Sequence, residues 1–166
     1  MSNRPAENEG RYINLVPEED LLSALESQTR ETERLLRSIS EEKSRYRYAP
    51  EKWSIKTLVR HVTDTERIFG YRILAMARGE SHPLPGFDEN AYAAASEADE
   101  RRFGDLVEEW RTVRAATITL LRGLSPRAWE GSGTVNDTKR SVRSIAYNTL
   151  GHERHHLKVL RDKYGV

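Results

Sequence analysis

Apolar residues recur at helical spacing in four long segments of this sequence, and stretches rich in Pro and Gly separate the segments. Spacings of three and four residues place side chains on one face of an α-helix, which is typical of helices packed around a shared core. We predict helices at about residues 17–46, 54–78, 99–122 and 141–163, with a short helical turn at about residues 90–95. No alternating strand pattern and no internal repeat is visible.

Local signals support the ends of these segments. Pro17 is followed by three acidic residues, which favour the positive end of a helix dipole. Ser54 is a plausible N-cap, and Gly79 is expected to end the helix that starts there. The pattern predicts an all-α four-helix bundle in which one or both of the longer loops, residues 79–92 and 124–140, cross over the bundle.

Composition narrows the class of protein. The length of 166 residues fits one domain, which we place at residues 13–166 after a flexible N-terminus at residues 1–12. The 27 basic and 26 acidic residues are interspersed, so nucleic acid and membrane surfaces are not expected partners. No segment resembles a signal peptide or a membrane span, which predicts a cytoplasmic protein. Cysteine is absent, so any metal must be bound by nitrogen and oxygen ligands.

The stretch GHERHH at residues 151–156 contains the H-E-x-x-H pattern of zinc proteases. Such proteases need a third ligand, which normally follows the motif. Only ten residues follow His156, and Val159 and Asp162 stand where the extended pattern requires Gly and His. The protease interpretation is therefore rejected.

The same histidines fall on the inward stripe of the last predicted helix, which reads Val142, Ile145, Thr149, His152 and His156. Side chains four residues apart lie roughly 6 Å from each other and can bind one ion, whereas His155 points about 100° away, toward the flank. Two unpartnered imidazoles in an apolar stripe are costly, and a metal removes that cost. The alternatives are a hydrogen-bonded pair of core histidines or an exposed polar face.

A third nitrogen ligand must come from upstream, where only His61 and His82 remain. His82 lies beside Pro83 in a loop, which favours a surface role. His61 lies about two turns into its predicted helix, next to the apolar positions Leu58 and Val62. It is either a ligand or an exposed histidine at the edge of the stripe. Three histidines from helices of a bundle would leave coordination positions open for a substrate.

Two stretches resemble the DinB-like superfamily of metal-dependent enzymes, which includes YfiT-type proteins and bacillithiol transferases. They are KWSIKTLVRHVTDTER, which contains His61 and Asp64, and AYNTLGHERHHLKVLRDKYG near the C-terminus. The resemblance extends from about residue 13 to the end. It implies an up-down-down-up bundle, a divalent metal, zinc or nickel, held by His61, His152 and His156, and a homodimer.

The resemblance also implies a small-molecule substrate and either of two reactions. Some relatives transfer a low-molecular-weight thiol such as bacillithiol to an electrophile, and others are described as hydrolases. We expect thiol transfer, with hydrolysis of a small ester or amide as the alternative and a non-catalytic metal- or ligand-binding module as a second alternative.

Two carboxylates are candidate catalytic residues. Asp64 lies one turn after His61 and would orient a ligand, or else it pairs with Arg60 or Arg67. Glu153 is the base by analogy with zinc proteases, or else it faces solvent or pairs with an arginine. Four polar residues interrupt the apolar stripes and either line a pocket or are hydrogen-bonded locally: Gln28, Thr32, Thr117 and Thr149.

Overall fold

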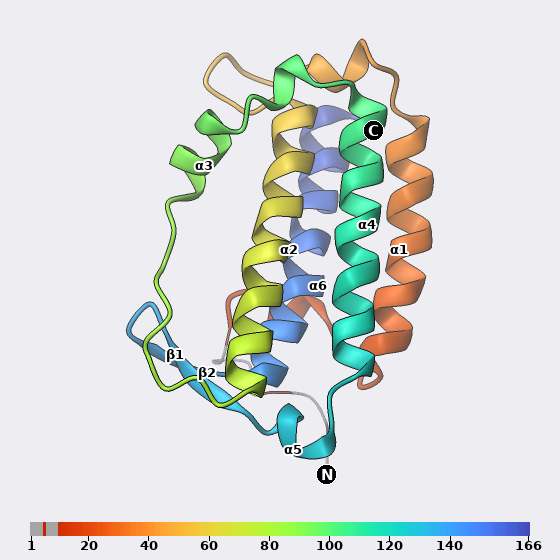
Figure 1. Cartoon of the computed structure of the whole chain (residues 1–166). Coiled ribbons are helices and arrows are strands. Elements are labelled where there is room, and N and C mark those ends of the chain that lie inside the picture. The colour runs from red at the N-terminus through yellow and green to blue at the C-terminus, as the bar shows by residue number, and fades with distance from the viewer. Residues whose placement is uncertain (1–4, 6–9) are drawn as a thin grey trace.

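A computed structural model describes Pro5 and residues 10–166, so parts of the predicted flexible N-terminus, residues 1–4 and 6–9, lie outside the described residues. Four long helices pack side by side as a bundle: α1 (Leu21–Ser38), α2 (Ile55–Ala77), α4 (Phe103–Arg122) and α6 (Val142–Val159). In Figure 1, α1 and α6 run upward and α2 and α4 run downward, and the long connection between α2 and α4 climbs the outside of the bundle. The predicted all-α bundle with up-down-down-up order is confirmed.

Shorter elements occupy the connections. The climbing connection contains α3 (Glu89–Ala95), and the connection into α6 contains α5 (Pro126–Trp129) and strands β1 (Ser132–Val135) and β2 (Thr138–Ser141). Single 3₁₀ turns lie at Ile13–Leu15, Lys43–Arg45 and Ala98–Glu100.

The first predicted helix was too long at both ends. Asp20 caps α1 by accepting a hydrogen bond from the Ser23 amide, so the helix begins after the acidic run that follows Pro17. At the other end Ile39 has an extended backbone, and the residues predicted to continue the helix form a turn instead. Ser54, by contrast, caps α2 as predicted, since its hydroxyl accepts a hydrogen bond from the Thr57 amide.

Two short strands were not predicted. Strands β1 and β2 pair antiparallel, with Val135 opposite Thr138, around the turn residues Asn136 and Asp137. Both turn residues have positive φ, 47° and 58°, which is the conformation of a tight hairpin turn and one that Asn and Asp tolerate. The hairpin is too short for an alternating pattern to stand out.

The core consists of two apolar clusters with a polar layer between them. One cluster contains Leu25, Ile73 and Leu121, and the other contains Leu36, Leu58, Val62, Leu106 and Leu157. On each long helix, buried polar residues stand between the two: Gln28 and Thr32 on α1, Thr65 and Glu66 on α2, Arg114 and Thr117 on α4, and Thr149, His152 and Glu153 on α6. Among the described residues, no helix combines the length and apolar character needed to cross a membrane.

Candidate metal centre

The three predicted ligands come together in the polar layer. His61 from α2 and His152 and His156 from α6 offer ring nitrogens that all lie within 4.8 Å of one another. The Nε2 atom of His152 lies 3.1 Å from Nε2 of His61 and 3.1 Å from Nε2 of His156. His61 and His152 are 5% and 6% exposed, so the cluster lies inside the bundle.

The hydrogen-bonding capacity of His152 is too small for this arrangement. An imidazole nitrogen either donates one hydrogen or accepts through one lone pair. Nε2 of His152 can therefore satisfy only one of its two nitrogen neighbours at a time. A cation that accepts a lone pair from one nitrogen of each ring satisfies the three converging nitrogens at once.

The three rings are neutral at physiological pH. Burial lowers the pKa of His152 to about 2, assisted by the neighbouring imidazoles, and burial lowers the pKa of His156 to about 3. Burial also lowers the pKa of His61. Neutral imidazole is the form that ligates a metal, so no proton has to leave before an ion binds.

Two of the three nitrogen separations also fit one ion. Nitrogen ligands lie about 2.0–2.1 Å from zinc, which places two ligands of the same ion roughly 2.9–3.4 Å apart at octahedral or tetrahedral angles. The two separations of 3.1 Å at His152 fall within that range. The residues present thus fit a divalent metal.

Aromatic residues surround the cluster. The Trp53 ring lies 4.8 Å from the His61 ring, and the Tyr12 ring lies 5.4 Å from the His152 ring. Tyr12 also contacts His155, at 5.2 Å between ring centroids.

The other two histidines are not part of the cluster. His82 lies apart in its loop and pairs with Glu80 through Nδ1. Neither His82 nor His155 belongs to the group of three converging nitrogens.

A second buried polar cluster, which we call the ion-pair cluster, consists of Glu66, Arg114 and Glu153. Arg114 is fully buried, donates from Nε and Nη2 to the two oxygens of Glu66 at 2.8 Å, and also pairs with Glu153. The two carboxylates raise the pKa of Arg114 against the effect of burial. The other oxygen of Glu153 accepts from Thr32 and Gln28 on α1. Both carboxylate oxygens of Glu153 thus accept hydrogen bonds from side chains inside the bundle.

Asp64 has a similar set of partners nearer the surface. Its carboxylate accepts hydrogen bonds from Arg60 at 3.0 Å and from Arg67 at 3.1 Å. These contacts, and those of Glu153 with Arg114, are the ion pairs that the sequence offered as alternatives to catalysis. A catalytic role for either carboxylate stays a prediction.

The four polar residues in the apolar stripes divide into two kinds. The hydroxyls of Thr117 and Thr149 donate to the carbonyl groups of Val113 and Ile145, one turn earlier in their own helices. Gln28 and Thr32 instead reach across to Glu153. The first pair is hydrogen-bonded locally, and the second pair joins α1 to α6.

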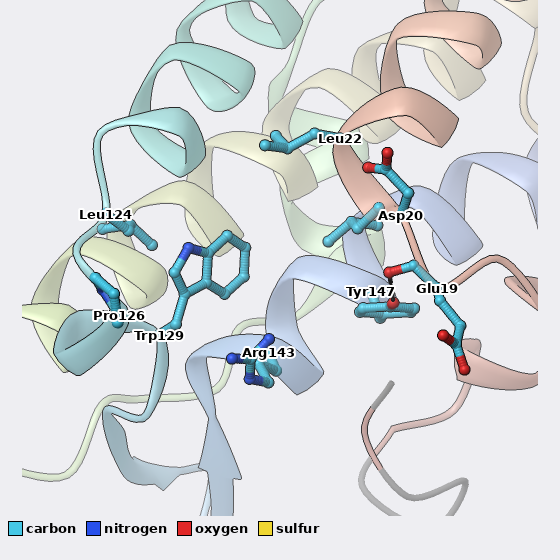
Figure 2. A pocket seen from close by; sticks show the side chains of 9 residues that line it. Glu19, Asp20, Leu22, Leu124, Pro126, Trp129, Arg143 and Tyr147 are labelled. Carbon is cyan, nitrogen blue, oxygen red and sulfur yellow. Dashed lines mark hydrogen bonds between the residues drawn. The ribbon is translucent and has the colours of Figure 1, made fainter. Parts of the chain in front are cut away.

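A large cavity, of about 580 Å³, lies at the end of the bundle where α1 and α6 begin (Figure 2). Its polar groups already serve the local structure: Asp20 caps α1, the Tyr147 hydroxyl donates to the Glu18 and Glu19 carbonyls, and Arg143 stacks on Trp129 and pairs with Glu130. None of the three clustered histidines lines it. The large volume of this cavity therefore does not make it the candidate active site.

Fold and site together define a four-helix bundle with a candidate three-histidine metal centre. The chain belongs to the DinB superfamily, which matches residues 24–160. The fold resembles YfiT from Bacillus subtilis, described as a probable metal-dependent hydrolase, with a TM-score of 0.74, 15% identity and coverage of 97% of this chain and 93% of that one. It also resembles a mycothiol-dependent maleylpyruvate isomerase, with a TM-score of 0.70, 16% identity and coverage of 95% of this chain and 64% of that one. No protein with a curated description matches.

Several residues around the site were not identified from the sequence. Tyr12, Asn148 and Gly151 join the N-terminal segment to α6, and Glu66 and Arg114 complete the ion-pair cluster. A glycine inside a strongly helical pattern, as at Gly151, was the available signal, because such a residue often marks a close backbone approach. The partners of Glu66 and Arg114 come from other helices and have no local signal.

Proposed function

We propose that this chain is a divalent-metal-dependent enzyme in which His61, His152 and His156 bind the ion, and that it transfers a low-molecular-weight thiol to an electrophilic substrate. The observation that carries the proposal is the position of His152, whose Nε2 faces two other imidazole nitrogens and can hydrogen-bond only one of them. Zinc and nickel are the metals that the family resemblance implies, and three neutral imidazoles suit both.

The bound ion supplies a Lewis acid that lowers the pKa of a thiol or a water molecule toward neutrality. In thiol transfer the thiol would release its proton to solvent, its sulfur would form a bond to an electrophilic carbon, and the bond from that carbon to the leaving group would break with both electrons going to the leaving group. The three histidines hold the ion with no negative charge of their own, which favours an anionic sulfur beside it. The mycothiol dependence described for one structural neighbour supports a thiol as the co-substrate.

Metal-dependent hydrolysis of a small ester or amide is the second candidate. The description of YfiT as a probable hydrolase, together with the coverage of nearly both whole chains, favours it. The same neutral ligand set would activate water instead of a thiol. Within either reaction, we propose that Asp64 and Glu153 contribute mainly through their ion pairs, since arginines already occupy both carboxylates.

The two reactions can be separated directly. Metal-loaded protein is incubated with several thiols and an epoxide or a chloro-aromatic acceptor, and conjugates are sought by mass spectrometry. We expect a conjugate with one of the thiols that is lost in His61→Ala and kept in His82→Ala. No conjugate with any thiol, together with metal-dependent cleavage of esters or amides, would favour hydrolysis instead.

We also propose that the enzyme acts in the cytoplasm as a homodimer. Tyr71 and Leu74 lie three residues apart on α2 and are 58% and 41% exposed, which supports a contact between copies on this face. Size-exclusion chromatography with light scattering tests the dimer, and a monomer at micromolar concentration would contradict it.

A further inference from the structure

The histidine cluster is covered on the side of His152. The Tyr12 amide donates to Oδ1 of Asn148 at 3.0 Å, and a Cβ atom on Gly151 would lie 2.2 Å from the Tyr12 carbonyl oxygen. The N-terminal segment therefore packs directly on the α6 backbone, with the Tyr12 ring against His152 and His155. A small molecule has to approach the three nitrogens from elsewhere.

On the side of His156, a cavity of about 240 Å³ reaches the cluster. We call it the His156 cavity; its walls include His156, the rings of Tyr48, Trp53 and Tyr164, and the charged residues Glu51 and Lys52. At roughly 30 Å³ for each water-sized group, it has room for about eight such groups. That is the size of one small ring with a substituent.

The aromatic walls are fixed in place. The Tyr48 and Tyr164 rings meet edge to face at 5.0 Å, and the Tyr164 hydroxyl donates to the Trp53 carbonyl at 2.7 Å. Trp53 also contacts the His61 ring, so one side chain borders both the cavity and a proposed metal ligand. Rigid aromatic walls favour flat molecules, which stack on them at little conformational cost.

The charge of the metal ion favours a bound molecule with an anionic donor atom. Glu51 and Lys52 carry opposite charges, so the cavity lining adds no net charge of either sign. The charge of a divalent ion on three neutral imidazoles is not cancelled, and an anionic donor balances it. We propose that the His156 cavity is the substrate subsite and takes small, flat, aromatic or conjugated molecules that place an anionic atom on the metal. This rests on the proposed metal centre.

Cobalt(II) in place of the native metal gives a visible spectrum that reports ligand exchange, and benzoate and acetate are the probes. They share a carboxylate and differ by a ring. We expect benzoate to bind at least about 10-fold more tightly than acetate. Trp53→Leu, which keeps apolar bulk without a flat face, should weaken benzoate by about 2- to 12-fold and leave acetate unchanged.

Two variants serve as controls. Trp129→Leu removes the tryptophan of the other cavity (Figure 2) and should change neither affinity. Trp53→Phe keeps a ring and should retain most of the preference, while thermal unfolding shows that each variant is folded. Equal binding of the two probes, or equal effects of Trp53→Leu and Trp129→Leu, would overturn the subsite alone. Failure of the wild-type protein to take up cobalt would overturn the proposed function and the subsite with it.

Discussion

The two buried polar clusters of this bundle differ in how completely their groups are satisfied. In the ion-pair cluster, Arg114 serves both Glu66 and Glu153, and each carboxylate oxygen has a donor. In the histidine cluster, neutral nitrogens face one another and compete for a single partner at His152. A saturated cluster needs nothing further and ties helices together, whereas an unsaturated one has capacity left to bind. We therefore expect the ion-pair cluster to stabilise the fold, and we propose that the histidine cluster binds a metal.

Removing the guanidinium of Arg114, which both carboxylates share, should have the largest effect on stability. Arg114→Met leaves two carboxylates buried without their partner, and we expect a loss of about 3–5 kcal/mol in the free energy of unfolding. Urea denaturation measures it. Arg111→Met is the matched control, because Arg111 pairs with Glu108 at the surface, where solvent screens the pair, and its effect should be far smaller. Equal effects of the two variants would show that burial does not distinguish these ion pairs.

Burial of the histidine cluster should make the stability of the protein depend on pH. The pKa of His152 falls from 6.5 in the unfolded chain to about 2 in the folded chain, so below pH 6.5 the unfolded chain binds a proton that the folded chain does not. Stability is therefore complete above about pH 6.5 and is lost as pH falls, by about 2 kcal/mol at pH 5 for this one ring. Urea unfolding of metal-free protein at several pH values measures it. A His152→Leu variant with an equally steep profile would contradict this origin.

The packing of the N-terminal segment on α6 beside His152 can be tested by adding a methyl group at Gly151. Gly151→Ala places a methyl group against the Tyr12 carbonyl and should cost about 1–3 kcal/mol. Gly70→Ala is the matched control on α2, where nothing lies within 4 Å of an added Cβ, and it should be neutral or stabilising by up to about 1 kcal/mol. Thermal unfolding compares them, and a Gly151→Ala protein as stable as Gly70→Ala would show that the N-terminal segment does not pack on α6.

The smallest effect concerns Glu153, one of the two candidate catalytic carboxylates. Glu153→Gln keeps an oxygen for Thr32 and Gln28 but loses the charge that faces Arg114, which should cost about 1–2 kcal/mol while metal content stays unchanged. Arg114 remains paired with Glu66. Unchanged stability with complete loss of the reaction would instead support Glu153 as a catalytic base.

Much of the fold could be predicted from the sequence because helical periodicity is local. The stripe through Thr149, His152 and His156 placed these two of the three α6 histidines inward, and Ser54 marked the start of α2. The end of α1 at Ser38 was missed because Ile39 extends the apolar stripe by one more position and no Gly or Pro follows it before Pro50. The hairpin was missed because its strands are four residues long, although its Asn136-Asp137 turn was a usable signal.

The site was only partly predictable for a different reason. The convergence of His61 with His152 was expected from a family resemblance, since spacing along one helix says nothing about which residue of another helix it meets. The same limit hid the pairing of Arg114 with Glu66 and Glu153, which are 48 and 39 residues away in the sequence. Charged residues bordering the inward stripes of three helices were visible, but their partners are fixed only by packing.

The most direct test of the whole account is the metal content of purified protein, measured by elemental analysis for the wild type and five histidine variants. We predict about one divalent ion per chain in the wild type, near-complete loss in His61→Ala, His152→Ala and His156→Ala, and retention in His155→Ala and His82→Ala. A wild-type protein without metal, or equal loss in all five variants, would contradict the claim that these three rings form a metal centre.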